Sequence, residues 1–529
     1  MSDWQKHILG KLTLRQKIAQ MISVRALSHF VSSDSESFAS LSRLVSDVGI
    51  GGVTFFQGTV PGQAFYVNQL QSLADIPLLV AQDAENGIGM RLTDATILPH
   101  MMAIGATGDP LNAYEASKII AAESNVLGVH HIFAPVADVN TDPDNPIINT
   151  RSFGSDPERV ASFVVESVRG LQDSNVIATV KHFPGHGDTA IDTHLNLATL
   201  EFDRSRLDEV ELVPFRAAFE AGVRSCMVGH LSVPCIDPTG LPASLSRPIV
   251  TGLLRNELGY DGLIVTDALD MKAITNTYGA GEAAVMAVEA GVDMLLLVAD
   301  EVQALDAIEQ AVDSGRTSEQ WIDASVARIL REKEWCGLNR QPEVSIADVF
   351  SVVANTDHLS RAVSLASAGI CSMDGLDIQA VGDSYDQMIV LIKDDVCSGS
   401  GEIFTRELSS AAPASYVIYP ESTSSDIDAL VKASGEYDRV VVAVFLSVRS
   451  YSGSISFPPM ILAAITKLAA DSRNIVVLFG SPYVYALFDA GCPCIATCST
   501  SPASEIAAAE FLIRGGKCPG SLPVTLQRV

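Results

Sequence analysis

The residues IATVKHFPGHGDT, from Ile177 to Thr189, combine a predicted strand with the polar loop that follows it. It opens with a short apolar, β-branched run and ends in a polar loop whose glycines and proline permit tight turns. Ile177–Lys181 is therefore expected to be a strand that carries Lys181 and His182 at its carboxyl end. Similar short apolar runs alternate with longer helical patterns along the first 340 residues.

This alternation predicts βα units around a parallel sheet. The eight predicted strands are Ile18–Val24, Gly51–Phe56, Leu78–Gln82, His131–Pro135, Ile177–Lys181, Ser225–Gly229, Gly262–Thr266 and Asp293–Leu297. Helices predicted between them include Pro110–Asn125, Asp156–Gln172, Glu209–Ala221 and Gly281–Ala290. Eight such strands fit one closed (β/α)8 barrel of the TIM type.

A second α/β series follows a polar segment. Cys336–Glu343 contains Gly337 and Pro342, which is typical of a linker, and we place the linker at about 336–348. The later predicted strands are Met388–Ile392, Ser415–Tyr419, Arg439–Phe445, Asn474–Phe479 and Pro493–Thr497, with helices at Asp426–Ala433 and Pro459–Ala470. We expect a catalytic barrel over 1–340 and an α/β/α sandwich with an open parallel sheet over 341–529.

The composition excludes several classes of partner. The 529 residues carry 35 Lys+Arg against 63 Asp+Glu, a formal net charge of −28, and 47 % of them are hydrophobic. Such a globular, acidic chain is not expected to bind nucleic acid or anionic membranes, which are held through Lys and Arg. No apolar run reaches the roughly 18–20 residues of a membrane span. Met1–Lys17 lacks a basic region followed by an apolar one, so we expect a cytoplasmic protein.

Cysteines and histidines do not predict a metal site. The nine cysteines are odd in number and widely spread, which favours free buried thiols in a reducing compartment. Cys492, Cys494 and Cys498 lack the CxxC spacing of zinc ligands. The HxxxH spacing of His182 and His186 needs a helix, which the Pro-Gly pair between them disfavours. We expect neither a metal nor a cofactor.

Polar residues gather where the predicted strands end, which is where (β/α)8 barrels hold their active sites. In the loop after Thr189, the Asp192 carboxylate is expected to bond one ring nitrogen of His194 and fix its tautomer. The other nitrogen then transfers a proton. A loop of surface histidines is the structural alternative.

A second candidate lies in GLIVTDALDM, residues 262–271, where an apolar strand runs directly into Asp267. At the barrel mouth this carboxylate can attack an anomeric carbon as a nucleophile. A helix N-cap is the structural alternative. Asp270 is expected one turn into the following helix, where the helix dipole favours it.

A third set of residues suits a sugar, whose vicinal hydroxyls are held by a carboxylate and by cationic donors. Asp83, Arg151, Lys181 and His182 supply that mixture. His230, at the end of the sixth strand, is a further candidate for substrate binding. Arg91 and Glu85 are expected to form a structural ion pair beneath the loop after the third strand.

Several motifs together resemble glycoside hydrolase family 3, and most closely its β-N-acetylglucosaminidases with a histidine acid/base. The motifs are KHFPGHGDT (181–189), DTH (192–194), VTDALDM (265–271), AENGIGMRL (84–92) and NTRSFGSDP (149–157). The closing GKCPGSLPVT (516–525) resembles the end of the family's C-terminal sandwich.

The resemblance implies a role for each matching residue. It implies Asp267 as nucleophile, His194 as general acid/base and Asp192 as the dyad partner of His194. It also implies that the non-reducing sugar is held by Asp83, Arg151, Lys181 and His182, with Arg91 as a weaker candidate.

The implied activity is that of a retaining, exo-acting β-N-acetylglucosaminidase that releases terminal β-N-acetylglucosamine from a small carbohydrate through a covalent glycosyl-enzyme. A histidine is neutral after giving up its proton and does not repel an anionic acceptor, so a phosphorylase on the same site is one alternative. A broader β-glucosidase/β-N-acetylglucosaminidase is another, and a catalytically silent sugar-binding protein is the remaining one. The acidity of the chain weighs towards water, or a neutral sugar, as the acceptor.

Asn86 and Ile88 depart from the DxEGGRVxR pattern usual in that branch, which bears on the sugar's outer hydroxyls and on the aglycone. The sequence leaves the aglycone open among muropeptide, chitooligosaccharide and glycoconjugate, and suggests cell-wall or chitooligosaccharide salvage. The second domain is expected to lend residues to the site, to complete a homodimer or to brace the barrel.

Overall fold

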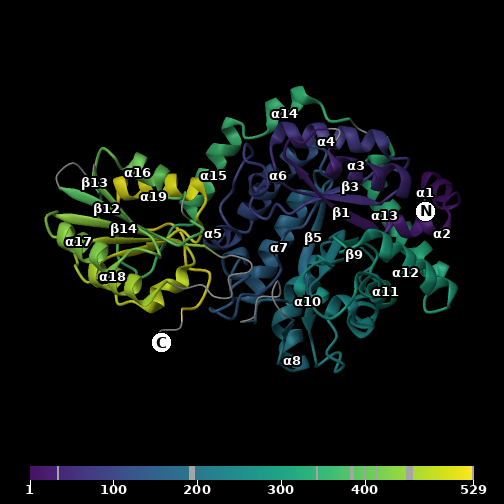
Figure 1. The fold of residues 1–529 in the computed structure, drawn as a ribbon. Coiled ribbons are helices and arrows are strands. Elements are labelled where there is room, and N and C mark those ends of the chain that lie inside the picture. Colours follow the sequence, from purple (N-terminus) through teal and green to yellow (C-terminus); the bar gives the residue numbers. More distant parts are fainter. Residues whose placement is uncertain are drawn as a thin grey trace. The chain divides into compact units, whose positions relative to one another are not determined.

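The computed structural model describes residues 1–32, 35–189, 197–340, 343–381, 386–397, 399–412, 414–447 and 457–526. The chain divides into two compact units (Figure 1). The first comprises Met1–Thr96, Tyr114–Asp138 and Val164–Asn355, and the second comprises Ile97–Ala113, Val139–Phe163 and Thr356–Val529. The division into 1–340 and 341–529 stays a prediction.

The first unit is built on a ring of parallel strands, as the sequence predicts. Its strands are β1 (Ile22–Ser28), β2 (Gly52–Gly58), β3 (Leu79–Gln82), β4 (His131–Ile132), β5 (Ile177–Phe183), β7 (Ser225–Val228), β9 (Leu263–Thr266) and β10 (Leu295–Leu296). They follow the order β10-β1-β2-β3-β4-β5-β7-β9. The Thr266 N–H donates to the Met294 carbonyl over 3.1 Å and joins β9 to the start of β10. The predicted eight-stranded barrel is confirmed.

Helices surround this ring (Figure 1). Those lying wholly or partly in the first unit are α1 (Asp3–Leu9), α2 (Leu14–Gln20), α3 (Glu36–Arg43), α4 (Val60–Leu73), α6 (Leu111–Val126), α7 (Pro157–Gln172), α8 (Arg204–Arg206), α9 (Leu212–Glu220), α10 (Lys272–Thr275), α11 (Ala280–Ala290), α12 (Glu301–Asp313), α13 (Glu319–Trp335) and α14 (Ile346–Val352). Shorter elements are the 3₁₀ turns η2 (Ile88–Met90), η5 (Ala243–Leu245) and η7 (Leu338–Arg340), the π-helical segments η1 (Leu44–Val48), η4 (Leu207–Glu211) and η6 (Pro248–Glu257), and the strand pair β6 (Ala198–Thr199) and β8 (Leu231–Ser232).

The first strand begins four residues later than the prediction of Ile18–Val24. Ile18 and Ala19 belong to helix α2, whose start is fixed by a capping box at Thr13 and Gln16. The apolar run is buried in both its helical and its strand half. Hydrophobicity alone therefore could not separate the helix end from the strand start.

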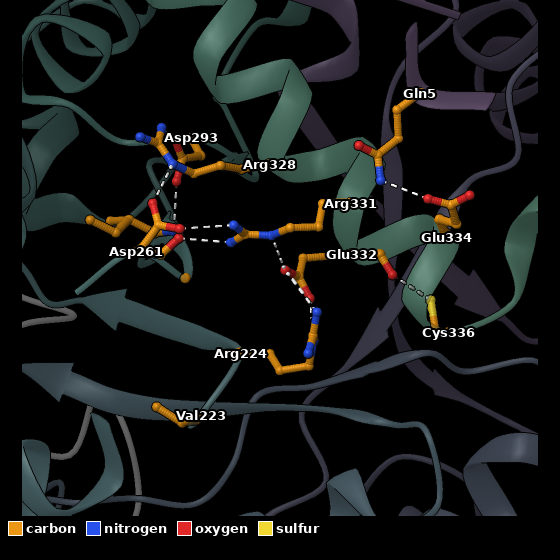
Figure 2. A network of polar contacts seen from close by, with 12 residues as sticks. Gln5, Val223, Arg224, Asp261, Asp293, Arg328, Arg331, Glu332, Glu334 and Cys336 are labelled. Atoms are coloured by element: carbon orange, nitrogen blue, oxygen red, sulfur yellow. Dashed lines mark hydrogen bonds and ion pairs between the residues drawn. The ribbon is translucent and has the colours of Figure 1, made fainter. Parts of the chain in front are cut away.

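The amino-terminal end of the barrel is held by ion pairs whose carboxylates are buried (Figure 2). The fully buried Asp293 accepts from Arg255 and, over 2.9 Å, from Arg328. The nearly buried Glu332 accepts from Arg224 over 2.5 Å and from Arg331 over 3.1 Å. These contacts fasten helix α13 to the barrel at the end away from the predicted active site.

The second unit is an α/β/α sandwich. Its strands are β11 (Cys371–Ser372), β12 (Gln387–Lys393), β13 (Ala414–Ile418), β14 (Arg439–Leu446), β15 (Ile475–Gly480) and β16 (Cys494–Ala496), in the order β11-β16-β15-β14-β12-β13. Its helical elements are α5 (Met101–Ala106), α15 (Thr356–Ala368), α16 (Glu402–Glu407), α17 (Ser424–Ser434), α18 (Pro459–Ala469), α19 (Pro502–Arg514), η3 (Asn149–Arg151) and η8 (Pro482–Leu487). Helices α17 and α18 cover one face of the sheet, and α16 and α19 cover the other (Figure 1).

The sheet departs from the prediction at one edge. Five strands are parallel as expected, whereas the two-residue β11 pairs antiparallel with β16. All nine cysteines are free thiols, and seven of them are buried. Within the described ranges, no three His, Cys, Asp or Glu side chains are placed to hold a metal ion. No helix in those ranges is long and apolar enough to cross a membrane.

Candidate active site

Strand register places three predicted site residues on the inner face of the barrel. Gln82 of β3 lies 3.3 Å from Gln63 of α4 and therefore faces the outer helices. Asp83, the next residue, faces inward because successive strand side chains alternate. Following the register around the ring puts Lys181 of β5 and Asp267, directly after β9, on the same inner face. All three lie at the carboxyl ends of their strands.

Asp83 is the centre of an ion cluster. Its carboxylate lies 2.8 Å from Lys181 Nζ and 2.8 Å from Arg91 Nη2. Burial alone would raise the pKa of Asp83, but the two cations outweigh burial and hold the pKa below its usual value. Lys181 also lies 2.7 Å from Glu85. The four charges form one cluster, rather than the isolated Arg91–Glu85 pair that the sequence suggests.

His182 is oriented by a buried carboxylate. Asp138, fully buried after β4, lies 2.8 Å from His182 Nδ1 and also accepts the His182 backbone N–H over 3.1 Å. Since a carboxylate only accepts, Nδ1 carries the hydrogen and Nε2 is the nitrogen left to meet a ligand. Asp138 further accepts the His186 backbone N–H over 2.8 Å. It therefore fixes both the ring of His182 and the turn that follows.

Asp267 lies at the rim and is half-buried. Its backbone N–H donates to Val228 over 2.9 Å, and its Oδ1 accepts the Ala268 N–H over 2.7 Å. The next helix, α10, begins only at Lys272 and has Met271 as its N-cap. The carboxylate of Asp267 is therefore not the cap of that helix.

Asp270 is not inside a helix, so the expectation of a place one turn into it is wrong. It lies in the turn before α10 and pairs with Arg25 over 2.8 Å. Burial raises the pKa of Asp270 and the nearby Asp267 charge adds to the rise, whereas Arg25 opposes it.

Two rim residues escape the sequence-based prediction. Arg25 of β1 and Phe56 of β2 share the inner face of Asp83 by register. The Phe56 ring lies between two guanidinium groups, with Arg25 Cζ at 4.7 Å and Arg91 Cζ at 4.8 Å from its centroid. Arg25 directly follows the predicted strand Ile18–Val24, but its contacts with Phe56 and Asp270 arise only in the fold.

The other predicted residues have different surroundings. The buried His230 meets the Ser244 hydroxyl over 2.7 Å and donates from Nε2 to the Ala268 carbonyl over 2.9 Å, so it supports the backbone beside Asp267. Arg151 belongs to the second unit, where it donates to the Ile147 carbonyl over 3.0 Å. Asp192 and His194 lie outside the described residues. The predicted substrate contacts of Arg151 and His230, and the predicted acid/base dyad of His194 and Asp192, stay predictions.

Comparison with known proteins gives consistent matches. Residues 13–332 match the model of the glycosyl hydrolase family 3 N terminal domain. The chain is 32 % identical over 388 residues to beta-hexosaminidase A of Pseudoalteromonas piscicida, covering 67 % of this chain. It is 30 % identical over 376 residues to a beta-N-acetylglucosaminidase/beta-glucosidase of Cellulomonas fimi, covering 69 % of this chain. These matches span 64 % and 65 % of the lengths of those two relatives.

Among solved structures, the chain resembles a glycoside hydrolase family 3 beta-N-acetylglucosaminidase from Paenibacillus sp. str. FPU-7. The TM-score is 0.86 at 34 % identity, over 98 % of this chain and 100 % of that one.

Proposed function

This chain belongs to glycosyl hydrolase family 3, and on that premise we propose that it is a retaining, exo-acting β-N-acetylglucosaminidase. It releases terminal β-N-acetylglucosamine from a small carbohydrate. The observation that carries the proposal is the placement of Asp83, Lys181 and Asp267 on one inner face at the carboxyl ends of the barrel strands. The names of the relatives from Pseudoalteromonas, Cellulomonas and Paenibacillus support the choice of sugar.

In this proposal the reaction is a double displacement. The Asp267 carboxylate attacks the anomeric carbon while His194, paired with Asp192, gives its proton to the departing glycosidic oxygen. His194 then removes a proton from water, which attacks the glycosyl-enzyme and releases Asp267. Two inversions at one carbon restore the β configuration.

The charged cluster suits recognition of the non-reducing sugar. Asp83 accepts hydrogen bonds from two hydroxyls, and the Lys181 ammonium and His182 Nε2 serve as further partners at the same end. Arg91 holds Asp83 from the other side over 2.8 Å. Arg151 and His230 are further proposed contacts with the substrate.

The proposal also covers the cellular location, the metabolic role and the partners of the protein. The protein acts in the cytoplasm, in salvage of cell-wall or chitooligosaccharide fragments, without a nucleic-acid or membrane partner. Completing a homodimer is one of the roles that we propose for the second domain.

A hydrolysis assay with a chromogenic β-N-acetylglucosaminide tests the activity. Wild type is expected to release the chromophore at least about 1,000-fold faster than Asp267→Ala, because the variant lacks the nucleophile. Product anomers followed by NMR should show β-N-acetylglucosamine first. Equal rates for the two proteins, or the α-anomer as first product, would overturn the proposal.

The acceptor is tested separately by adding inorganic phosphate to the same assay. The proposal expects free N-acetylglucosamine at all phosphate concentrations. Accumulation of N-acetylglucosamine 1-phosphate would replace hydrolysis by phosphorolysis on the same site.

A further inference from the structure

A buried glutamate lies beneath the turn that follows β5. Glu211, the last residue of η4, is 1 % exposed. Its Oε1 lies 3.2 Å from Arg206 Nη2. Its Oε2 is buried and meets no hydrogen-bond partner within the described part of the chain. A buried carboxylate oxygen without a partner raises the free energy of the folded state most when the group is charged, so burial favours the protonated form.

Glu211 packs directly against this turn. Gly185 has φ +127°, and a Cβ atom at that position would lie 2.8 Å from Glu211 Cβ and 2.9 Å from Glu211 Oε2. Only glycine tolerates both the backbone conformation and this approach. The position of residue 185 is therefore set by the glutamate side chain.

The same turn is also held by Asp138, which accepts the backbone N–H groups of His182 and His186. The Gly185 N–H closes the turn by donating to the His182 carbonyl over 2.8 Å. Residues 182–186 thus contact two carboxyl groups, those of Asp138 and Glu211. His182, a proposed sugar contact, is the first residue of this clamped turn.

The charges around Glu211 are unbalanced. Burial raises its pKa to about 8, Arg206 opposes the rise, and the negative Asp188 and Asp138 add to it. Arg206 is shared, since its Nη2 also lies 3.8 Å from Asp188. Among the described residues, the charges that act on Glu211 are thus two carboxylates, Asp138 and Asp188, and one cation, Arg206. Ionisation of Glu211 adds a third negative charge to this group, in which Asp138 and Glu211 are buried and Asp188 is partly exposed.

We propose that Glu211 is a positioning residue that carries a proton at neutral pH and holds the turn of residues 182–186 in place for sugar binding. When Glu211 loses that proton, its negative charge is repelled by Asp138 and Asp188. The repulsion displaces the turn and moves His182 away from the substrate. Activity therefore falls at alkaline pH for a reason separate from the acid/base residue. This inference rests on the proposed function.

The test uses β-N-acetylglucosaminyl fluoride, whose leaving group needs no general acid, and follows kcat/KM against pH. Wild type should lose about tenfold by about pH 9, one unit above the pKa of Glu211. Glu211→Gln, which stays neutral, should keep its activity over this range. Glu209→Gln, an exposed change on the same segment, should behave as wild type. An alkaline fall that is the same in wild type and Glu211→Gln overturns the inference.

If Glu211→Gln does not fold, a second variant tests the role of Glu211. Arg206→Met removes the cation that opposes the pKa rise, so the alkaline fall should move to higher pH. A fall that stays in place or moves to lower pH contradicts the inference. Wild type without any activity on the fluoride would instead refute the proposed function itself.

Discussion

The Lys181 ammonium lies 2.8 Å from Asp83 Oδ1, and this ion pair joins the carboxyl ends of β5 and β3 across the barrel mouth. Both side chains face inward by strand register. The pair gives the site a fixed acceptor beside a fixed donor, which is the arrangement that two adjacent hydroxyls of a sugar require.

Asp83→Asn should lower kcat/KM for a chromogenic β-N-acetylglucosaminide by about 10- to 100-fold, because hydrogen bonds to a charged group are lost. The measurement is steady-state kinetics, with Asp75→Asn, an exposed aspartate on the same unit, as the matched control. A variant with wild-type kcat/KM would remove Asp83 from the proposed site.

Asp138→Asn tests the orientation of His182. An amide can donate to Nδ1, so the ring is free to take the other tautomer and present a hydrogen at Nε2. We expect kcat/KM to fall by about tenfold or more while the thermal unfolding temperature changes little. A fall in stability with unchanged kcat/KM would assign Asp138 a purely structural role.

Lys333 of α13 should lower the free energy of unfolding at neutral pH. It is fully buried, its Nζ donates to Gln20 over 2.7 Å, and burial lowers its pKa to about 7. Unfolding restores the ordinary pKa of 10.5, so the unfolded chain binds more protons between these values and stability rises with pH across that window.

Lys333→Met should therefore raise the free energy of unfolding near pH 7 by about 1–3 kcal/mol, and by less near pH 10. Urea unfolding at both pH values measures this difference, with the exposed Lys11→Met as control. A variant that is destabilised at both pH values would contradict the expectation.

Asp293→Ala should destabilise the barrel and leave its catalytic activity unchanged. The substitution leaves the partly buried Arg255 and Arg328 without the carboxylate that they share. We expect a loss of about 3–5 kcal/mol in chemical denaturation and near wild-type kcat/KM at low temperature. Loss of activity in a fully folded variant would contradict this expectation, because it would mean that the ion pairs of Asp293 affect the active site.

The sequence predicted the barrel because its strands are short apolar runs bounded by polar residues. For the same reason it located Asp83, Lys181 and Asp267, each of which directly follows or ends such a run. It misplaced the first strand because helix α2 and β1 form one continuous buried apolar stretch. Arg25 directly follows that predicted strand, but its contacts with Phe56 and Asp270 arise only in the fold.

Other site features depend on contacts between distant segments, which no local pattern reveals. Glu211 sits in a helical pattern like any surface glutamate, and only the fold brings it under Gly185. Asp138 follows a two-residue strand, and its bonds to His182 and His186 arise from tertiary packing. The short β11 has too few residues to produce a strand pattern.

In the proposed reaction, Asp267 forms a covalent bond to the sugar. A β-N-acetylglucosaminyl fluoride bearing a further fluorine at C5 slows both displacements and should accumulate the glycosyl-enzyme. Proteolysis and mass spectrometry are then predicted to find one added fluoro-sugar on the peptide that contains Asp267, and none in Asp267→Ala. Label on another carboxylate, or turnover with no covalent adduct at any time, would contradict the account.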